Sequence, residues 1–361
     1  MKKLIIALFV LKLTFGFSQS GNPAAYYNGF NFNQTGMALK EALAIKITQT
    51  HTHFLTYQQA EDAIKVVDVD PTDNNNVFLV YGFSSTICPA DVTDHKDHRK
   101  RYKYDDGTGA CNWNREHTFA KSLGDPDLGN DGPGSDAHHI RASDVDRNSD
   151  RASRKFAAGS GNSGIIGAYW YPGDEWKGDI ARMMMYMYLR YGTQCIPMYV
   201  SVGTVNSIDG NMINLLLEWN AEDPVSEVED RRNTYLGNAN NAYGQGNRNP
   251  FIDNPFLATV IWGGSPAENR WPGMFLSNTT FDLSNSIAIY PNPTNDNHIN
   301  ITSNNTIDTI ELININGQLV QKIQHPTEVN HSYTLENLPQ GFYFVKLTSN
   351  SQTATKKIVV N

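Results

Sequence analysis

Two linked stretches decide the fold of this chain. The first reads Cys111-Asn-Trp-Asn-Arg-Glu-His-Thr-Phe119, and the second reads Asp136-Ala-His-His-Ile-Arg-Ala-Ser-Asp-Val-Asp-Arg-Asn148. They place a carboxylate beside an imidazole, Glu116 and His117, and an amide, Asn148, further along the chain. A histidine can take a proton from water near neutral pH, and a hard ion such as Mg²⁺ prefers oxygen ligands and keeps positions open for phosphate. These side chains therefore predict hydrolysis of a phosphodiester with one divalent metal.

The same two stretches predict a strand, a loop, a second strand and a helix. The strands cover residues 115–119 and 137–141, and the loop between them, residues 124–135, is rich in Gly, Asp and Pro. Ser143 with Asp146 resembles a capping box, so we expect a helix from Ser143 to about residue 156.

One face of this expected helix carries polar side chains. Asp144, Asn148, Arg151 and Lys155 fall at helical spacing on it. Asparagine is a poor helix former, so the position of Asn148 on this face indicates a functional role. The alternative is an asparagine exposed there by chance.

The neighbouring positions of Glu116 and His117 set a geometric condition. Adjacent residues of a strand point to opposite faces. A site that uses both side chains requires a twist or bulge where the strand ends, or a metal reached from the strand edge.

The start of the chain has the pattern of a secretory signal peptide. Met1-Lys-Lys precedes an apolar run over residues 4–17, and small residues follow, so we expect residues 1–18 to be removed before Gln19. No other apolar run approaches the roughly 20 residues of a spanning helix, so we expect no membrane span in the mature protein.

The net charge is unusual for a protein that binds nucleic acid. It is −8, and loss of the three leader lysines leaves 26 cationic against 37 anionic side chains, or −11. Phosphate binding normally requires a basic surface, so local clusters of cationic side chains would have to attract the substrate. The candidates are residues 98–103 and the set Arg141, Arg147, Arg151, Arg154 and Lys155. Solvated charged faces are the alternative interpretation.

The chain has three cysteines. Export permits a disulfide, and Cys88 with Cys111 is the favoured pair because both flank the basic segment ahead of the predicted site. Cys195 would then be a buried thiol. Two free thiols at Cys88 and Cys111 are the alternative.

Other segments divide the chain into two unequal domains. Apolar residues recur at helical spacing in residues 37–47, 57–67 and 174–191, and residues 212–233 form another helical region. From about residue 283 the pattern changes to short alternating runs, and Asn316-Gly317 is a strong hairpin signal. Residues 283–361 therefore predict a small β-sandwich.

The first domain resembles the bacterial endonuclease I family. The resemblance covers roughly residues 25–265 and begins with Arg115-Glu116-His117 and the segment that carries Asn148. Further matches are Lys177-Gly-Asp-Ile-Ala-Arg182, Trp219, Asp223-Pro224, Glu229, Arg232-Asn233 and Gln245-Gly-Asn-Arg-Asn-Pro-Phe-Ile-Asp253.

This resemblance implies an α+β fold, with a mainly helical nuclease domain over residues 19–275 that contains a ββα-metal (His-Me finger) motif. Glu116 and Asn148 would hold one Mg²⁺, or Mn²⁺ or Ca²⁺ in its place. His117 would be the general base, with Arg141 and Arg151 as further catalytic residues. The product would carry a 5′-phosphate.

The resemblance also suggests residues that contact the substrate: Arg115, Arg154, Lys177, Arg182 and Arg248. Family members often carry an arginine in the loop between the two strands, which neutralises the scissile phosphate. Here residues 124–135 contain none. Arg141, Arg151 or Arg154 could replace it.

The last domain resembles the C-terminal sorting domain of type IX (Por) secretion. The matching motifs are Tyr290-Pro-Asn-Pro-Thr294, Gly341-Phe-Tyr343 and Lys356-Lys-Ile-Val-Val360. Such domains are recognised by the type IX machinery and are typically removed. They imply export through the periplasm to the cell surface or the medium. An adhesion or carbohydrate-binding sandwich is the alternative.

Three functions remain open from the sequence. The first is a secreted, monomeric nuclease acting either on DNA alone or on both DNA and RNA. The second is a zinc hydrolase that uses His117, His138 and Cys111, although no closed Cys/His spacing supports it. The third is a catalytically inactive surface-binding protein that kept the scaffold.

Overall fold

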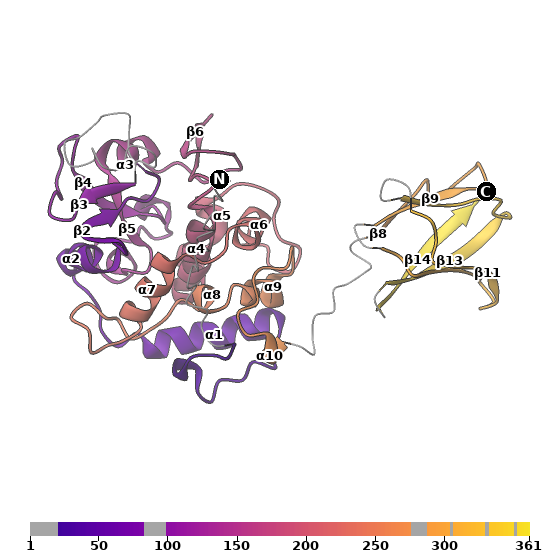
Figure 1. Cartoon of the computed structure of the whole chain (residues 1–361), viewed down its shortest axis with the longest axis horizontal. Coiled ribbons are helices and arrows are strands. Elements are labelled where there is room, and N and C mark those ends of the chain that lie inside the picture. The colour runs from indigo at the N-terminus through magenta and orange to yellow at the C-terminus, as the bar shows by residue number, and fades with distance from the viewer. Residues whose placement is uncertain (1–20, 83–98, 276–286, 304–305, 329–331, 350–351) are drawn as a thin grey trace, which may run out of the picture. The chain divides into compact units, whose positions relative to one another are not determined.

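The computed structural model describes residues 21–82, 99–275, 287–303, 306–328, 332–349 and 352–361. The chain divides into two compact units, Met1–Met274 and Phe275–Asn361. Helices and small sheets make up the first unit and strands dominate the second (Figure 1), which is compatible with the predicted α+β class. The predicted signal peptide lies outside the described residues.

A buried helix forms the centre of the first unit. Helix α4 (Lys177–Tyr191) is buried from Gly178 to Leu189, as expected for a helix that contacts other elements on all sides. It packs against helices α1 (Gly36–Thr50), α5 (Pro197–Val200), α6 (Asn214–Glu222) and α8 (Pro250–Asp253). Its four methionines fill the irregular spaces between these neighbours.

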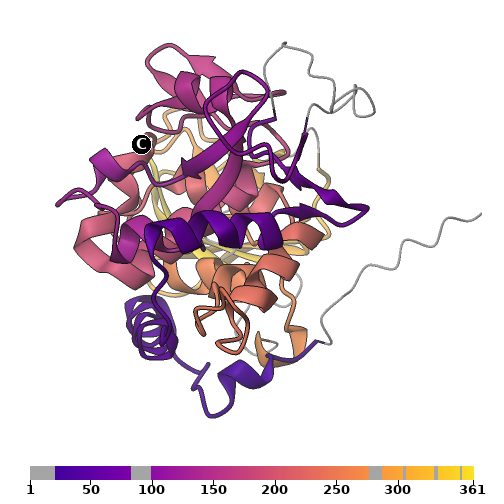
Figure 2. The same ribbon diagram turned by 90° about the vertical axis from the view of Figure 1, so that its left-hand side faces the viewer.

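The first two helices form where their apolar spacing predicts them. In α1, Leu39, Leu43 and Ile47 are fully buried against the core. Helix α2 (Tyr57–Val67) begins with a capping box in which the side chains of Thr56 and Gln59 each bond the other's backbone amide. Helix α1 lies across the view in Figure 1 and is seen end-on in Figure 2, whereas α2 lies across the view in Figure 2.

The predicted strand, strand and helix follow one another at the site. Strand β4 (Trp113–His117) pairs antiparallel with β5 (Ile140–Asp144), with Glu116 opposite Arg141 and His117 opposite Ile140. Trp113, Ile140 and Ala142 form one buried cluster with α2. This cluster anchors the two-stranded sheet on the α2 helix.

Helix α3 (Val145–Arg151) is shorter than the predicted helix at both ends. Its N-cap is Asp144, whose carboxylate accepts the backbone amides of Asp146 and Arg147. The predicted Ser143 cap is therefore wrong, because the aspartate accepts two amides at once. The helix ends at Ala152, which has a left-handed backbone with φ 46°. Lys155 consequently lies beyond the helix face to which it was assigned.

The remaining elements complete the first unit. The predicted helical region of residues 212–233 is two helices, α6 and α7 (Glu227–Leu236), separated by a short break. The other elements are β1 (Val69–Asp70), β2 (Asp73–Phe78), β3 (Lys100–Tyr102), β6 (Gly164–Ile166), β7 (Tyr169–Tyr171), α9 (Phe256–Trp262), α10 (Pro272–Phe275) and the 3-10 turns η1 (Ala25–Tyr27), η3 (Lys121–Leu123), η4 (Gly132–Ser135) and η5 (Gly192–Cys195). Across the described ranges, we find no helix with the length and apolar character to cross a membrane.

The second unit consists of two antiparallel sheets around one core. One sheet has the order β11-β10-β13-β14 and the other the order β12-β9-β8. Their strands are β8 (Ile287–Tyr290), β9 (Ile299–Ser303), β10 (Thr309–Asn314), β11 (Leu319–Gln324), β12 (Ser332–Leu335), β13 (Gly341–Ser349) and β14 (Gln352–Val360). Inward residues of both sheets, such as Ile301 and Val345, belong to a single buried cluster. The predicted turn at Asn316-Gly317 joins β10 to β11, with Gly317 at φ 79°.

Candidate active site

A cleft of about 300 Å³ lies where strand β4 ends. Its walls come from β4, the η3 turn and helix α3, and they include Arg115, Glu116, His117, Lys121, Asn148 and Arg151. The carboxylate, the imidazole and the amide on which the sequence prediction depends therefore meet at one cleft.

The position of this cleft explains how two adjacent strand residues can both face it. His117 is the last residue of β4, and β4 and β5 form a two-stranded sheet. Strict alternation of side chains holds only inside a regular strand. At the strand end it is relaxed, and Glu116 and His117 both line the same cavity.

Glu116 is a buried carboxylate held in one orientation. Only 2% of the residue is exposed. Its Oε1 accepts a hydrogen bond from the Tyr81 hydroxyl at 2.9 Å and lies 3.3 Å from a guanidinium nitrogen of Arg151. Burial raises the pKa of Glu116 to about 6, while Arg151 and Tyr81 oppose the rise. A cation in the cleft would therefore meet a preoriented, poorly hydrated carboxylate.

His117 is held as a neutral imidazole with a defined tautomer. Its Nε2 lies 3.0 Å from the carbonyl oxygen of Gly134. Because a carbonyl can only accept, Nε2 carries the proton and Nδ1 keeps the lone pair. Burial lowers the pKa of His117 to about 3, and the nearby His139 adds to this effect. The imidazole is therefore unprotonated at neutral pH, as a general base must be.

Asn148 lines the cleft from helix α3. Its Nδ2 donates to Oδ1 of Asn114 at 2.6 Å and to the carbonyl of Arg115 at 3.1 Å. These acceptors fix the amide orientation and leave Oδ1 for another partner. One carboxylate and one amide oxygen suit Mg²⁺, which commonly binds through one or two protein groups and completes its shell with water and phosphate.

The described ranges contain no group of three or more His, Cys, Asp or Glu side chains suited to a metal. A site built from Glu116 and Asn148 has only one such side chain, so its donor set fits a hard ion with a largely non-protein shell.

Arg151 lines the cleft and supports its other residues. Its guanidinium is buried and donates to the carbonyls of His117 at 3.2 Å and Thr118 at 2.7 Å, in addition to its contact with Glu116. These bonds hold the end of β4, so the structure places Arg151 as a support for Glu116 and His117.

The prediction of a catalytic Arg141 is not supported by its position. Its side chain is fully buried, with ion pairs to Asp68 at 3.1 Å and Asp179 at 3.0 Å. It does not line the cleft. Two buried carboxylates occupy this guanidinium, so Arg141 holds the core behind the strand pair.

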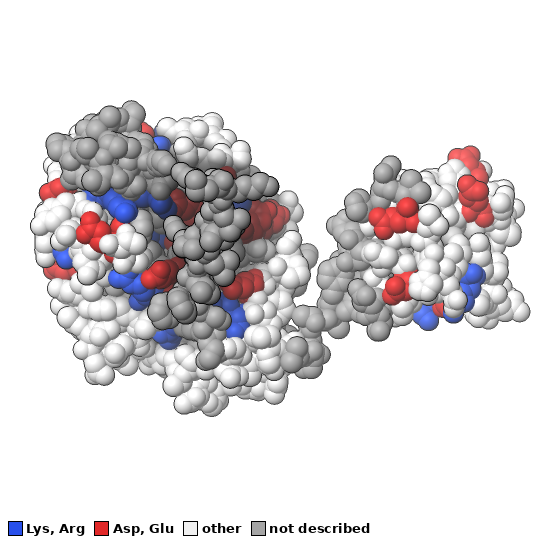
Figure 3. Space-filling model, in the orientation of Figure 1, with Lys and Arg blue, Asp and Glu red and all other residues white. Residues whose placement is uncertain are grey.

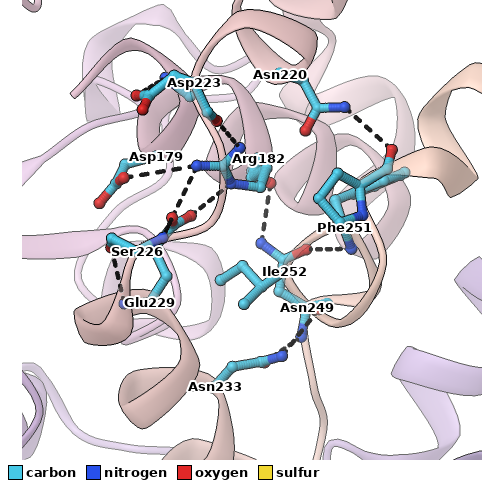
Figure 4. A network of polar contacts seen from close by, with 12 residues as sticks. Asp179, Arg182, Asn220, Asp223, Ser226, Glu229, Asn233, Asn249, Phe251 and Ile252 are labelled. Carbon is cyan, nitrogen blue, oxygen red and sulfur yellow. Dashed lines mark hydrogen bonds and ion pairs between the residues drawn. The ribbon is translucent and has the colours of Figure 1, made fainter. Parts of the chain in front are cut away.

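Arg182, predicted as a substrate contact, is likewise buried in the core and bonded to other residues (Figure 4). It makes two bonds to Glu229, at 2.6 and 2.8 Å, and one to the carbonyl of Asp223 at 2.7 Å. Glu229 also closes the capping box of α7 with Ser226. The motif residues in this region therefore join α4 to α7.

The other proposed substrate contacts are also engaged elsewhere. Arg248 is paired with Asp253, Lys177 with Glu222, and Arg154 donates to the carbonyl of Asp150. None of these three cations lines the cleft. Arg115 does line it, but its guanidinium pairs with Glu61 at 2.8 Å.

In the basic segment at residues 98–103, three of the four described cations are paired with carboxylates. Arg99 pairs with Glu175, Lys100 with Asp70 and Arg101 with Asp144. On the face drawn in Figure 3, Lys and Arg side chains of the first unit lie beside Asp and Glu. Pairing with local carboxylates explains why these clusters do not overcome the acidic composition.

Three residues at the site were not identified from the sequence: Tyr81, Tyr57 and Lys121. The Tyr57 ring stacks on His117, with centroids 5.7 Å apart, and also contacts Arg115 and Lys121. Helix α2 supplies this tyrosine to a strand far along the chain. No local pattern marks such a contact.

The structure describes two of the three cysteines. Cys111 is disulfide-bonded and Cys195 is a free, buried thiol. Cys88 lies outside the described residues, so its pairing with Cys111 stays a prediction. A disulfide-bonded Cys111 has no thiolate for zinc, and His138 Nε2 is engaged with the carbonyl of Asn247 at 2.9 Å. The zinc alternative therefore lacks its Cys111 ligand.

Comparisons with known proteins identify the families of the two units. Residues 35–256 match the model of the Endonuclease I family, and residues 288–361 match that of the Secretion system C-terminal sorting domain. An extracellular ribonuclease of Bacillus amyloliquefaciens is 36% identical over 253 residues, which cover 67% of this chain and 80% of the relative. An extracellular ribonuclease of Bacillus subtilis (strain 168) is 36% identical over 247 residues, which cover 66% and 78%.

A solved structure of PorZ, a surface component of the type IX secretion system of Porphyromonas gingivalis, matches with 12% identity over 23% of this chain and 12% of that chain. Its TM-score of 0.20 is too low to carry an argument. The two family matches and the extracellular relatives establish the family without it. The chain belongs to the endonuclease I family, and it is a secreted nuclease with a C-terminal sorting domain.

Proposed function

We propose that this protein is a metal-dependent endonuclease that hydrolyses phosphodiester bonds in DNA and RNA and leaves 5′-phosphate ends. The observation that supports the proposal most directly is the convergence of Glu116, His117 and Asn148 on one cleft. Strand β4, strand β5 and helix α3 follow in the order of a ββα-metal (His-Me finger) motif, and we assign them to it.

Glu116 and Oδ1 of Asn148 would hold one Mg²⁺, or Mn²⁺ or Ca²⁺ in its place. Bound there, the ion would polarise the phosphate and stabilise the charge on the departing 3′ oxygen. Tyr81 and Arg151 fix the carboxylate, and the two bonds of the Asn148 amide nitrogen fix the oxygen. Such outer contacts set ligand orientation before the ion binds.

His117 would activate the attacking water. Its Nδ1 accepts the proton, and the Gly134 carbonyl keeps the other proton on Nε2. The imidazolium that forms retains that hydrogen bond, so the proton is taken without a change in ring position. Tyr57 stacks on the ring and restricts its rotation.

The substrate would be bound mainly through its backbone. Contacts to phosphates carry no sequence information and weaken with salt. We therefore expect little sequence preference and strong inhibition by salt. Because both extracellular relatives are named ribonucleases, we include RNA with DNA among the substrates.

The sorting domain would direct export through the type IX machinery, followed by removal of the domain. The enzyme would act as a monomer at the cell surface or in the medium.

The deciding experiment is digestion of plasmid DNA and of a labelled RNA with Mg²⁺, with EDTA, and with Mg²⁺ or Zn²⁺ restored after chelation. We expect cleavage with Mg²⁺, none with EDTA and recovery with Mg²⁺, with 5′-phosphate ends on analysis. Absence of cleavage under all metal conditions would favour the inactive scaffold. Recovery with Zn²⁺ but not Mg²⁺ would contradict the magnesium assignment.

A further inference from the structure

We propose that Lys121 is the residue through which this cleft contacts a phosphate of the substrate. The inference rests on the proposed function, because it takes a nucleic-acid strand as the occupant of the cleft. It assigns the cation that the sequence left open among Arg141, Arg151 and Arg154.

Lys121 occupies the right place for this contact. It is half-buried on the η3 turn, in the same cleft wall as His117 and Asn148. Its Nζ lies 2.8 Å from Oδ1 of Asn130 and 4.8 Å from the centroid of the Tyr57 ring. That ring also stacks on His117, so Tyr57 contacts both the ammonium and the proposed base.

Of the three cations that line the cleft, Lys121 forms no ion pair with a carboxylate of the described residues, although the Asp127 carboxylate lines the same cleft. Arg115 is paired with Glu61, and Arg151 lies beside Glu116. Within the described ranges, the side-chain partners of Lys121 are neutral: the amide oxygen of Asn130, and the ring and hydroxyl of Tyr57 at 3.5 Å. No carboxylate oxygen there lies close enough to form an ion pair with it.

The chemistry of an ammonium group suits a phosphate at this position. Lysine has three N–H donors, and Asn130 and Tyr57 account for at most two of them. The free donor and the unneutralised charge would be satisfied by an anionic phosphodiester oxygen. The arginines proposed from the sequence do not provide such a free charge. Arg141 forms ion pairs with two carboxylates, and Arg154 does not line the cleft.

The test is equilibrium binding of a fluorescein-labelled single-stranded DNA oligonucleotide in EDTA, over a range of salt concentrations. The variants are Lys121→Met and Lys121→Arg. The control is Lys46→Met, since Lys46 also lies 4.8 Å over a tyrosine ring, that of Tyr26, but on α1 and outside the cleft. Both methionine variants remove one positive charge, so overall charge cannot explain a difference between them.

Loss of one phosphate contact should reduce the slope of log affinity against log salt by about 0.7 for a single strand. We expect this reduction and weaker binding for Lys121→Met, with Lys121→Arg close to wild type and Lys46→Met unchanged in slope. Thermal unfolding would confirm that each variant is folded. Equal slopes for Lys121→Met and Lys46→Met would overturn the inference. Since binding is measured without metal, the cleavage assay decides the proposed function separately.

Discussion

The Nε2 atom of His117 lies 3.0 Å from the carbonyl oxygen of Gly134, which joins the end of β4 to the turn that precedes β5. His139 makes a parallel bond from its own Nε2 to the carbonyl of Pro133 at 2.7 Å. Two consecutive carbonyls of η4 thus accept from two imidazoles. The turn between the strands sets the tautomer of the proposed base.

Replacing His117 tests its assignment as the base. His117→Ala should lower kcat by about 10² to 10⁴, the usual contribution of a positioned acid or base, with little change in substrate affinity. The measurement is single-turnover cleavage at saturating Mg²⁺, with circular dichroism as the check on folding. A folded variant with near wild-type activity would show that another group takes the proton.

Gly134 should tolerate no larger residue, because the turn is closely packed. A Cβ at Gly134 would lie 2.0 Å from the carbonyl oxygen of Gly129, whereas a Cβ at Gly210 meets nothing within 4 Å. We expect Gly134→Ala to displace the carbonyl that holds His117, with a lower kcat and a lower Tm. Gly210→Ala serves as the control and should alter neither. Equal behaviour of the two variants would contradict the role of the turn.

The Tyr81 hydroxyl should matter for metal binding. Tyr81→Phe keeps the ring beside Trp170 but removes the hydrogen bond to Glu116. Loss of an outer contact typically weakens metal affinity by about 10-fold or more. We therefore expect a higher Mg²⁺ concentration for half-maximal activity, with kcat largely restored at saturation. An unchanged Mg²⁺ requirement would remove Tyr81 from the site.

Arg182 should affect stability and not substrate binding. Arg182→Met leaves Glu229 buried without its partner, which typically costs about 3–5 kcal/mol of unfolding free energy. The exposed pair of Lys177 and Glu222 should contribute about 1 kcal/mol or less when Lys177→Met removes it. Urea unfolding measures both. If Arg182→Met instead raised KM at unchanged stability, its original assignment to the substrate would be restored.

Acid should weaken the fold through buried histidines. Burial lowers the pKa of His138 to about 4 and that of His139 to about 4, although Asp136 opposes both shifts. The unfolded chain, with ordinary histidine pKa values of about 6.5, binds these protons first. The stability that each neutral imidazole provides is therefore complete above about pH 6.5 and is lost as the pH falls toward about 4.

His138→Gln isolates this contribution. The stability of the wild type relative to the variant should decline by an amount on the order of 3 kcal/mol between pH 7 and pH 4, measured by urea unfolding at several pH values. A difference that stays constant with pH would mean that His138 is not held neutral in the folded protein.

The two ends of helix α3 were less predictable from the sequence than the residue types that line the cleft. The cap of α3 moved by one residue because the Asp144 carboxylate accepts two amides. The predicted helix face ended early because Ala152 adopts a left-handed conformation. Both outcomes depend on side-chain geometry within a single turn, for which helical periodicity gives no information.

The sequence by itself determined the features that arise from neighbouring residues: helices α1 and α2, the hairpin at Asn316-Gly317, and the chemical types of Glu116, His117 and Asn148. Tertiary structure alone decided which cations line the cleft. Arg141 reaches Asp68 and Arg182 reaches Glu229 across long stretches of chain. An ion pair forms where folding brings a carboxylate close to a cation, and separating a buried pair would leave an uncompensated charge. The cations left over for a substrate therefore become apparent only after every such partner has been located in space.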